Sequence, residues 1–295
     1  MRKLGYGEGV GMKKYIIVAE SGADLTREMI EENDIRIAPM HIEMDGIDYL
    51  DGTIPISQIT DYYDRTGKVP KTAGVNSSQY EEIFARIKKE TPDAVILHVC
   101  YSAQLSCGYQ SSIIADDGTM PVYRVDAKNV SIGHAYVVMK VIEIINKQPE
   151  IEPGELVKKV EYIAERTRFS FVPGNLVYLR AGGRVSNAQY LGATLLKILP
   201  TIEVIDGLML SKKKYRGSDK RIIRNMLTDY FKKFNIDKEM LFLGYVCAIS
   251  DEIKDEMNRQ AKEAGIKNIV WLMAGGVITS HSGQGGIGIA GLDLE

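Results

Sequence analysis

Short apolar runs alternate with helical patterns through the first half of the chain. Three of these runs predict buried strands, at 15–18, 94–99 and 122–125. Helix starts are indicated by Ser21-Gly-Ala-Asp24, which fits a capping box, and by Asn76, which precedes a helical stripe of apolar residues. A mostly apolar helical segment follows at 131–146. Strands that alternate with helices at this spacing predict a parallel sheet covered on both faces.

The pattern changes after a segment at 147–154 that contains proline, glycine and acidic residues. A helix is predicted from 155 to about 166. Strand candidates follow at 176–179, 202–205, 208–210, 241–249 and 268–272. Asp206-Gly207 stands between two apolar runs, which is a hairpin signal and predicts an antiparallel pair. We therefore expect a mixed sheet with helices in the second half.

The chain length supports a division into two domains. A chain of 295 residues is expected to form about two domains at roughly 150 residues each. The segment 1–12 is interpreted as a disordered N-terminal extension, because the residues from Met12 onward resemble a natural start. We expect a three-layer α/β/α domain with a parallel sheet at 13–160 and a mixed α/β domain at 161–295.

Composition excludes several classes of protein. The formal net charge is −2, with 45% hydrophobic and 26% charged residues, which is ordinary for a globular protein and argues against a main role in binding nucleic acid. The most continuous apolar stretch, 269–278, is well short of the ~20 residues that span a bilayer. Three cysteines without a C-x-x-C spacing form neither a disulfide framework nor a zinc site, and they favour a cytoplasmic location.

A glycine-rich segment near the C-terminus matches the dinucleotide-binding pattern G-x-G-x-x-G. The match runs from Gly283 to Gly288, and the few residues after it leave no room for the helix and the acidic residue that a nucleotide site requires. Two interpretations stay open. The segment is a tight turn before a terminal strand, or it brings the backbone close to a ligand beside His281.

Hydroxyl side chains gather where loops are expected. Ser102 and Ser106 follow the strand that ends at Val99, at the start of a predicted helix whose free N–H groups favour an anion. The alternative is that they only cap this helix. Thr72 lies in another expected loop. Because neither G-x-S-x-G nor S-x-x-K is present, the sequence does not indicate a nucleophilic serine.

The histidines and acidic residues show no metal-ligand spacing. His98 in a strand and His134 on an apolar helix are interpreted as core residues. Asp24, Asp126 and Asp206 lie near strand or turn boundaries, and nothing in the sequence pairs them.

Basic residues concentrate at 212–224, where seven Lys and Arg accompany one Asp. Such a run is usually a solvated face, and the alternatives are a docking surface for phosphate or an acidic partner and a nucleic-acid site. Arg180-Ala-Gly-Gly-Arg184 presents two further arginines beside paired glycines. Cys107 is either a reactive thiol at a helix start or a small buried residue.

Six short motifs occur in order along the chain: Ser21-Gly-Ala-Asp-Leu25, Lys71-Thr72, Ser102-Ala-Gln-Leu-Ser106-Cys-Gly-Tyr-Gln110, Val125-Asp126 through Ser131-Ile-Gly133, Leu179-Arg-Ala-Gly-Gly-Arg184-Val and Ser280-His281-Ser-Gly-Gln-Gly285. As an ordered set they resemble the DegV family, the fatty-acid-binding proteins that serve bacterial fatty acid kinase. The resemblance covers essentially all of residues 13–295. It implies a two-domain α/β fold with a lipid tunnel between the domains.

The resemblance also implies roles for particular residues. Thr72, Ser106 and His281 match the positions that hold the lipid carboxylate. The loops around them contain Ala73, Cys107, Gly108 and Gly283. Arg184 and Arg216 match arginines associated with the kinase and with phosphoryl transfer. The chain departs from the family at Ala73, where a hydroxyl residue is common, and at Gly108, where threonine is common.

The leading hypothesis is a lipid carrier without a cofactor that is not itself an enzyme. It binds a long-chain fatty acid, presents the carboxylate to an ATP-dependent kinase, and carries the acyl phosphate to acyltransferases. One rival is a small-molecule hydrolase or transferase that uses Ser106 or Cys107 as nucleophile and His281 as base. Another is a regulatory or nucleic-acid-binding role for the basic run at 212–224.

Overall fold

A computed structural model describes residues 14–185 and 198–295, so the expected extension at 1–12 lies outside the described residues. The described strands form three sheets. The first is parallel, with the order β2-β1-β6-β7, and consists of β1 (Tyr15–Glu20), β2 (Arg36–Ala38), β6 (Val95–Cys100) and β7 (Val122–Asp126). The three strands predicted in the first half are therefore confirmed.

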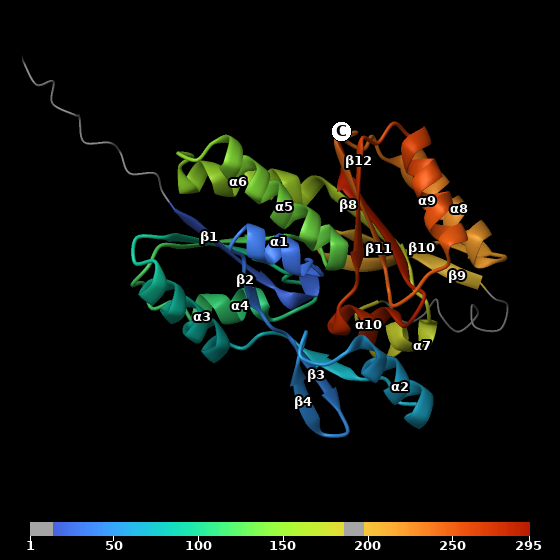
Figure 1. Cartoon of the computed structure of the whole chain (residues 1–295), viewed down its shortest axis with the longest axis horizontal. Helices are drawn as coiled ribbons and strands as arrows, with labels where there is room; N and C mark the ends of the chain where they lie inside the picture. Colours follow the sequence, from blue (N-terminus) through green and yellow to red (C-terminus); the bar gives the residue numbers. More distant parts are fainter. Residues whose placement is uncertain (1–13, 186–197) are drawn as a thin grey trace, which may run out of the picture.

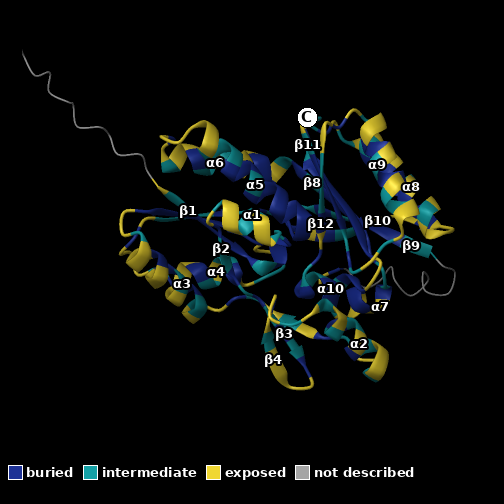
Figure 2. Ribbon diagram, in the orientation of Figure 1, coloured by how far each residue is buried: buried dark blue, intermediate teal, exposed yellow. Residues whose placement is uncertain are grey.

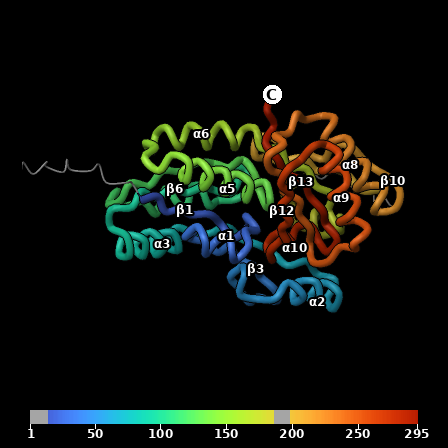
Figure 3. The backbone as a smooth tube through the Cα atoms, turned by 45° about the horizontal axis from the view of Figure 1, so that its top comes forward, coloured from blue at the N-terminus to red at the C-terminus, as the bar shows by residue number. Residues whose placement is uncertain are grey.

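Helices cover both faces of this first sheet (Figures 1 and 3). Ile17 and Leu97 pack against α5 (Ser131–Lys147) and α6 (Pro153–Arg166). The alternating neighbours Ile16 and Ile96 pack instead against α3 (Ser77–Glu90), beside which α4 (Gly108–Ile114) lies. Figure 2 shows α5 buried along most of its length, which explains why its sequence is apolar nearly all round.

The predicted capping box at Ser21 is wrong. Residues Ser21–Ala23 form a single 3-10 turn, η1, and Asp24 takes a left-handed conformation with φ 57°. The chain therefore leaves the helical path, and α1 (Arg27–Glu32) begins only after Thr26, whose side chain accepts a hydrogen bond from the Met29 N–H at 3.2 Å. By contrast, the helix start predicted at Asn76 is confirmed.

A small antiparallel sheet was not predicted. It has the order β4-β3-β5, formed by β3 (His41–Met44), β4 (Ile47–Leu50) and β5 (Lys71–Ala73), with α2 (Ile56–Thr66) between the last two strands in sequence. Asp45 and Gly46 both have positive φ, as a two-residue hairpin turn requires. This sheet matters for function because β5 carries Thr72.

The second large sheet is mixed, as expected. Its described strands have the order β10-β9-β8-β13-β11-β12. They are β8 (Thr167–Val172), β9 (Ile198–Ile205), β10 (Leu208–Arg216), β11 (Met240–Tyr245), β12 (Asn268–Met273) and β13 (Ile287–Leu292). The predicted hairpin is confirmed: β9 and β10 pair antiparallel around Asp206 and Gly207, which both have positive φ.

One strand prediction in this half is wrong. Residues 176–179 belong to α7 (Leu176–Ala181), because the Asn175 side chain accepts a hydrogen bond from the Val177 N–H at 2.9 Å and caps a helix. The strand β8 was not predicted, since it follows α6 directly and no turn residue separates the two elements.

Two layers cover the mixed sheet. On one face α8 (Asp219–Lys233) and α9 (Asp251–Glu263) pack against β11 and β13. The other face turns toward the first half of the chain and packs against α5. At this junction α7 contacts α10 (Gly276–Ser282), which lies between the mixed sheet and the small sheet (Figure 1).

Candidate functional site

A largely apolar pocket lies at the junction of the two halves. Its apolar wall includes Ile132, Phe169, Phe171, Leu179 and Met209. Besides two tyrosines, the polar side chains that line it are Thr72, Ser106, Ser131, Arg184, His281 and Ser282. A mostly apolar cavity with a few convergent polar groups is the usual form of a small-molecule site.

Thr72 and His281 meet across this junction although 209 residues separate them in sequence. Thr72 comes from β5 and His281 from the C-terminal turn of α10, and the distance from Oγ1 to Nε2 is 2.7 Å. Burial, and after it the nearby charge of Arg184, lowers the pKa of His281 to about 4. His281 is therefore neutral near pH 7.

Ser106 reaches the same pocket from the turn between β6 and α4. Its backbone N–H donates to the Ser102 carbonyl at 3.1 Å. A Cβ on Gly74 would lie 2.6 Å from Ser106 Oγ, so only glycine lets the end of β5 approach this hydroxyl. The structure thus brings Thr72 and Ser106 to one wall of the pocket.

Ser102 has a different position. Its buried hydroxyl donates to the Gly207 carbonyl in the β9–β10 turn at 2.6 Å, which joins the two halves of the chain. It does not line the pocket as Ser106 does.

Arg184 also lines the pocket, and its Nη1 donates to the Gly182 carbonyl at 2.6 Å. A Cβ on Gly182 would lie only 2.1 Å from His281 Nδ1. The paired glycines therefore place the arginine and the histidine side by side. Arg216 is not with them, because it is the exposed last residue of β10 and does not line the pocket.

The four expected loop residues occupy different positions. Ala73 lines the pocket, whereas Cys107, Gly108 and Gly283 do not. Cys107 is exposed at the start of α4. Position 108 requires glycine, since a Cβ there would lie 2.6 Å from Glu20 Oε1.

Glu20 is a buried residue that the sequence did not indicate. Its carboxylate accepts hydrogen bonds from the Tyr80 hydroxyl at 2.7 Å and from the Tyr101 N–H at 2.8 Å, and it lies 3.2 Å from His98 Nε2. Burial alone would raise the pKa of Glu20, yet His98 and Tyr80 lower it to about 2. The buried histidine His98 thus has its polar partners within the core, as expected.

Ser131 and Ser282 were not proposed as site residues from the sequence, although both line the pocket. Ser131 is the first residue of α5 and Ser282 the last of α10. Both lie within the ordered motifs, but the motifs assign them no role, because only the packing of these two helix ends places them at the cavity.

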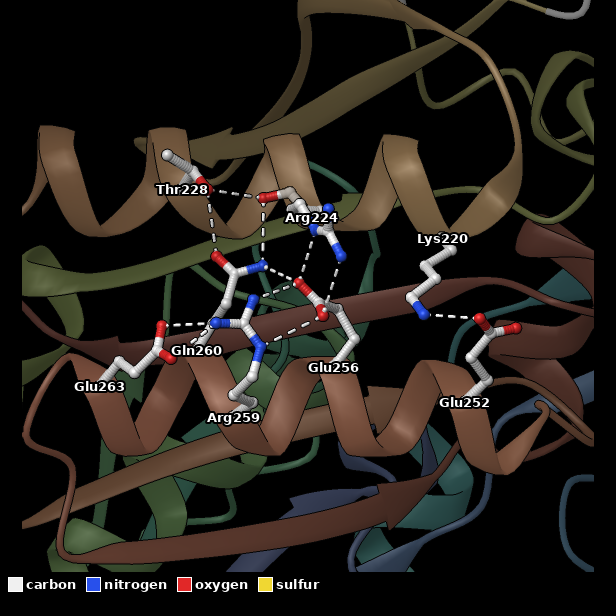
Figure 4. A network of polar contacts seen from close by, with 8 residues as sticks. All are labelled: Lys220, Arg224, Thr228, Glu252, Glu256, Arg259, Gln260 and Glu263. Atoms are coloured by element: carbon white, nitrogen blue, oxygen red, sulfur yellow. Dashed lines mark hydrogen bonds and ion pairs between the residues drawn. The ribbon is translucent and has the colours of Figure 1, made fainter.

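The basic run at 212–224 is paired with acidic residues in large part. Figure 4 shows Lys220 and Arg224 of α8 directed at Glu252 and Glu256 of α9, with shortest nitrogen–oxygen distances of 2.5 and 2.8 Å. Lys213 pairs with Asp229 at 2.5 Å. These ion pairs join elements of the mixed sheet layer and reduce the positive charge available to a nucleic acid.

The described residues offer neither a metal site nor a membrane-spanning helix. Over residues 14–185 and 198–295, no group of three or more His, Cys, Asp or Glu side chains could hold a metal ion. Within the same ranges no helix is both long enough and apolar enough to cross a bilayer. The polar contact of His281 Nε2 is with Thr72, and not with Ser106 or Cys107, the nucleophiles that the hydrolase alternative requires.

The fold and the site define a two-part α/β protein that encloses an apolar pocket with a small polar end. A comparison with protein families matches residues 14–293 to the family described as "Uncharacterised protein, DegV family". The chain therefore belongs to the DegV family.

Relatives and solved structures agree with this membership. A DegV domain-containing protein of Staphylococcus aureus (strain COL) is 26% identical over 281 residues, which cover 94% of this chain and 98% of the relative. A DegV lipid binding protein from Thermotoga maritima has a TM-score of 0.81 at 25% identity and covers 96% of this chain and 99% of its own. A DegV family protein from Thermus thermophilus, described as fatty acid binding, has a TM-score of 0.84 at 20% identity, with 95% and 100% covered. The expected α/β fold with a parallel and a mixed sheet is thus confirmed.

Proposed function

We propose that this chain binds a long-chain fatty acid in the pocket between its two halves. The observation that carries the proposal is the pairing of Thr72 with a neutral His281 at one part of a largely apolar cavity. Burial of about 15 methylenes at ~0.8 kcal/mol each gives on the order of 12 kcal/mol of gross driving force. Ordering of the ligand and desolvation of its polar end reduce this value considerably.

The carboxylate needs hydrogen-bond donors, since a buried charge without partners costs several kcal/mol. An ionised carboxylate only accepts, so the Thr72 hydroxyl donates its proton to the ligand and accepts from His281 Nε2–H. The neutral histidine therefore orients the threonine. Ser106 supplies a second hydroxyl in the same pocket, whereas Arg184, which also lines the pocket, is assigned to the later phosphoryl transfer.

We extend the proposal to a partner. The bound acid is presented to a separate ATP-dependent fatty acid kinase, and the chain then carries the acyl phosphate to acyltransferases without a cofactor of its own. Arg184 acts on the reacting carboxyl group, and the exposed Arg216 contacts the kinase. Ala73, Cys107, Gly108 and Gly283 shape the loops around the polar end. In this proposal residues 13–160 supply Thr72 and Ser106, and residues 161–295 supply Arg184 and His281.

The test measures displacement of a fluorescent fatty acid by variants of the full chain. Thr72→Val and Ser106→Ala each remove a donor to the carboxylate, and we expect at least about a tenfold loss of affinity from each. Arg184→Gln is expected to retain the fatty acid and to lose phosphorylation by the kinase.

Matched controls separate these effects from general damage. Ser57→Ala on the exposed face of α2 and Arg180→Gln beside the pocket leave both readouts unchanged. Unchanged affinity in both the Thr72→Val and Ser106→Ala proteins would contradict the assigned carboxylate site.

A further inference from the structure

Two buried carboxylates from the first half of the chain converge on the start of α10. Asp24 Oδ1 accepts a hydrogen bond from the Gly275 N–H at 2.7 Å. Asp51 Oδ1 accepts from the N–H groups of Gly276 at 3.0 Å and of Val277 at 3.3 Å. The helix has no side-chain cap of its own, so these groups, which lack partners within the helix, depend on residues from the distant half of the sequence.

The other end of α10 is bound to the same half of the chain. His281 lies on its last turn and contacts Thr72 at 2.7 Å. Both ends of this seven-residue helix are therefore fixed to the N-terminal half, and the position of its first turn sets the position of the histidine.

Asp24 also contacts α5, a second element that borders the pocket. Its Oδ2 is 2.5 Å from the hydroxyl oxygen of Ser131, the first residue of α5 and a lining residue of the pocket. Neither Asp24 nor Asp51 lines the pocket itself. A single carboxyl group thus joins two helix starts that border the cavity.

The start of α10 packs closely against the two carboxyl groups, so that its glycines leave no room for a side chain. A Cβ on Gly275 would lie 3.2 Å from Asp24 Oδ1 and 3.7 Å from Asp51 Oδ2. A Cβ on Gly276 would lie 2.6 Å from Ile42 and 2.8 Å from Asp51 Oδ1. The two carboxyl groups bind the N–H groups of the adjacent residues Gly275 and Gly276 in a buried site, where charging both is costly, so one of them keeps a proton.

Burial identifies Asp24 as the group that keeps the proton. It raises the pKa of Asp24 to about 8 against the lowering effect of the hydrogen bonds from Ser131 and Gly275, and the charge of Asp51 adds to the increase. Burial also raises the pKa of Asp51.

The neighbouring groups Tyr101, His134 and His281 have pKa values displaced away from the neutral range, so they do not take the place of Asp24 as the titrating group. Tyr101 lies in the β6–α4 loop, and burial raises its pKa far above neutrality. The charge of Arg184 lowers the pKa of Tyr101, and the charge of Glu20 raises it. Glu20 itself stays ionised because His98 and Tyr80 lower its pKa. On α5, burial lowers the pKa of His134, and on α10 the neutral His281 stays uncharged above about pH 4.

We propose that Asp24, protonated beside Asp51, forms a proton-linked latch that positions His281 for the lipid carboxylate through α10. Both aspartates are positioning residues, because they act on the ligand only through the helix and α5. When Asp24 releases its proton to solvent, two adjacent negative charges repel each other and weaken the hold on Gly275. His281 then moves away from Thr72 and no longer orients its hydroxyl, and the fatty acid is released more readily. This inference rests on the proposed function, since fatty acid affinity is its readout.

The test measures the affinity of the full chain for a fluorescent fatty acid from about pH 6 to about pH 9. The wild-type affinity is expected to fall above about pH 8, by up to about tenfold per pH unit, the limit for loss of one proton. Asp24→Asn keeps the neutral shape: its Oδ1 accepts from the Gly275 N–H, and its amide N–H donates to the Ser131 hydroxyl oxygen as the protonated acid does. It therefore retains the neutral-pH affinity and shows no fall. Asp24→Ala has a lower affinity at every pH.

Other variants keep the test decisive if Asp24→Asn folds poorly. Asp51→Asn removes the adjacent charge but keeps an oxygen that accepts from Gly276 and Val277, so Asp24 ionises without repulsion. The neutral-pH affinity is retained and the fall above about pH 8 becomes smaller than in the wild type. A fall as large as that of the wild type would contradict the latch. Asp93→Asn, an exposed control, leaves the profile unchanged. A wild-type protein that binds the fatty acid with a flat pH profile would overturn the latch. A wild-type protein that binds no fatty acid at any pH would overturn the proposed function instead.

Discussion

Gly182 shows how strongly one small residue determines the geometry of the site. A side chain at this position would collide with the imidazole of His281, as the 2.1 Å distance from its Cβ position to Nδ1 indicates. The backbone of Gly182 is helical, so the requirement for glycine comes from this close approach and not from backbone strain. The same residue accepts the hydrogen bond from Arg184.

Gly182→Ala is therefore expected to displace His281 from Thr72. Because the displaced histidine no longer orients the threonine hydroxyl, fatty acid affinity should fall by at least about tenfold, which displacement of a fluorescent fatty acid measures. The matched control is Gly154→Ala in α6, where nothing lies within 4 Å of the added Cβ. That change should leave affinity unchanged and stabilise the helix by roughly 0.5–1 kcal/mol. Equal affinities for both variants would argue against the role given to His281.

At the scale of single elements, local signals predicted those parts of the fold whose hydrogen bonds are local. The start of α3 depends on Asn76 and Gln79, which are three residues apart, and Asp206-Gly207 forms its own turn. The prediction failed where distant contacts decide the structure. The short strand β5 exists because it pairs with β3, and its three residues carry no strand pattern of their own.

The cap of α3 gives a prediction at this scale. The Asn76 side chain accepts a hydrogen bond from the Gln79 N–H at 3.0 Å, so Asn76→Ala should reduce the free energy of unfolding by about 1 kcal/mol. Asn76→Asp keeps an acceptor at the same place and should remain within a few tenths of a kcal/mol of the wild type. Denaturant unfolding of the three proteins measures the difference. A loss as large in Asn76→Asp as in Asn76→Ala would show that the cap is not the cause.

At the scale of the whole molecule, the pocket exists only because the two halves pack together. Thr72 and Ser106 come from the first half, and Arg184 and His281 come from the second. Periodicity along the chain predicted a parallel and a mixed sheet, but no local pattern relates residues that are 209 positions apart. The ordered motifs of the DegV family associated these residues, and the fold brings four of them to one cavity. Arg216 remained outside it because it lies at the far end of β10 from Met209, which lines the pocket.

The central claim is that the cavity between the halves holds one long-chain fatty acid. Native mass spectrometry of the intact chain purified from bacterial cells tests it most directly, together with extraction and identification of any bound lipid. We expect one fatty acid per chain, released on denaturation. A chain that carries no lipid and takes up no long-chain fatty acid when one is supplied in excess would contradict the account.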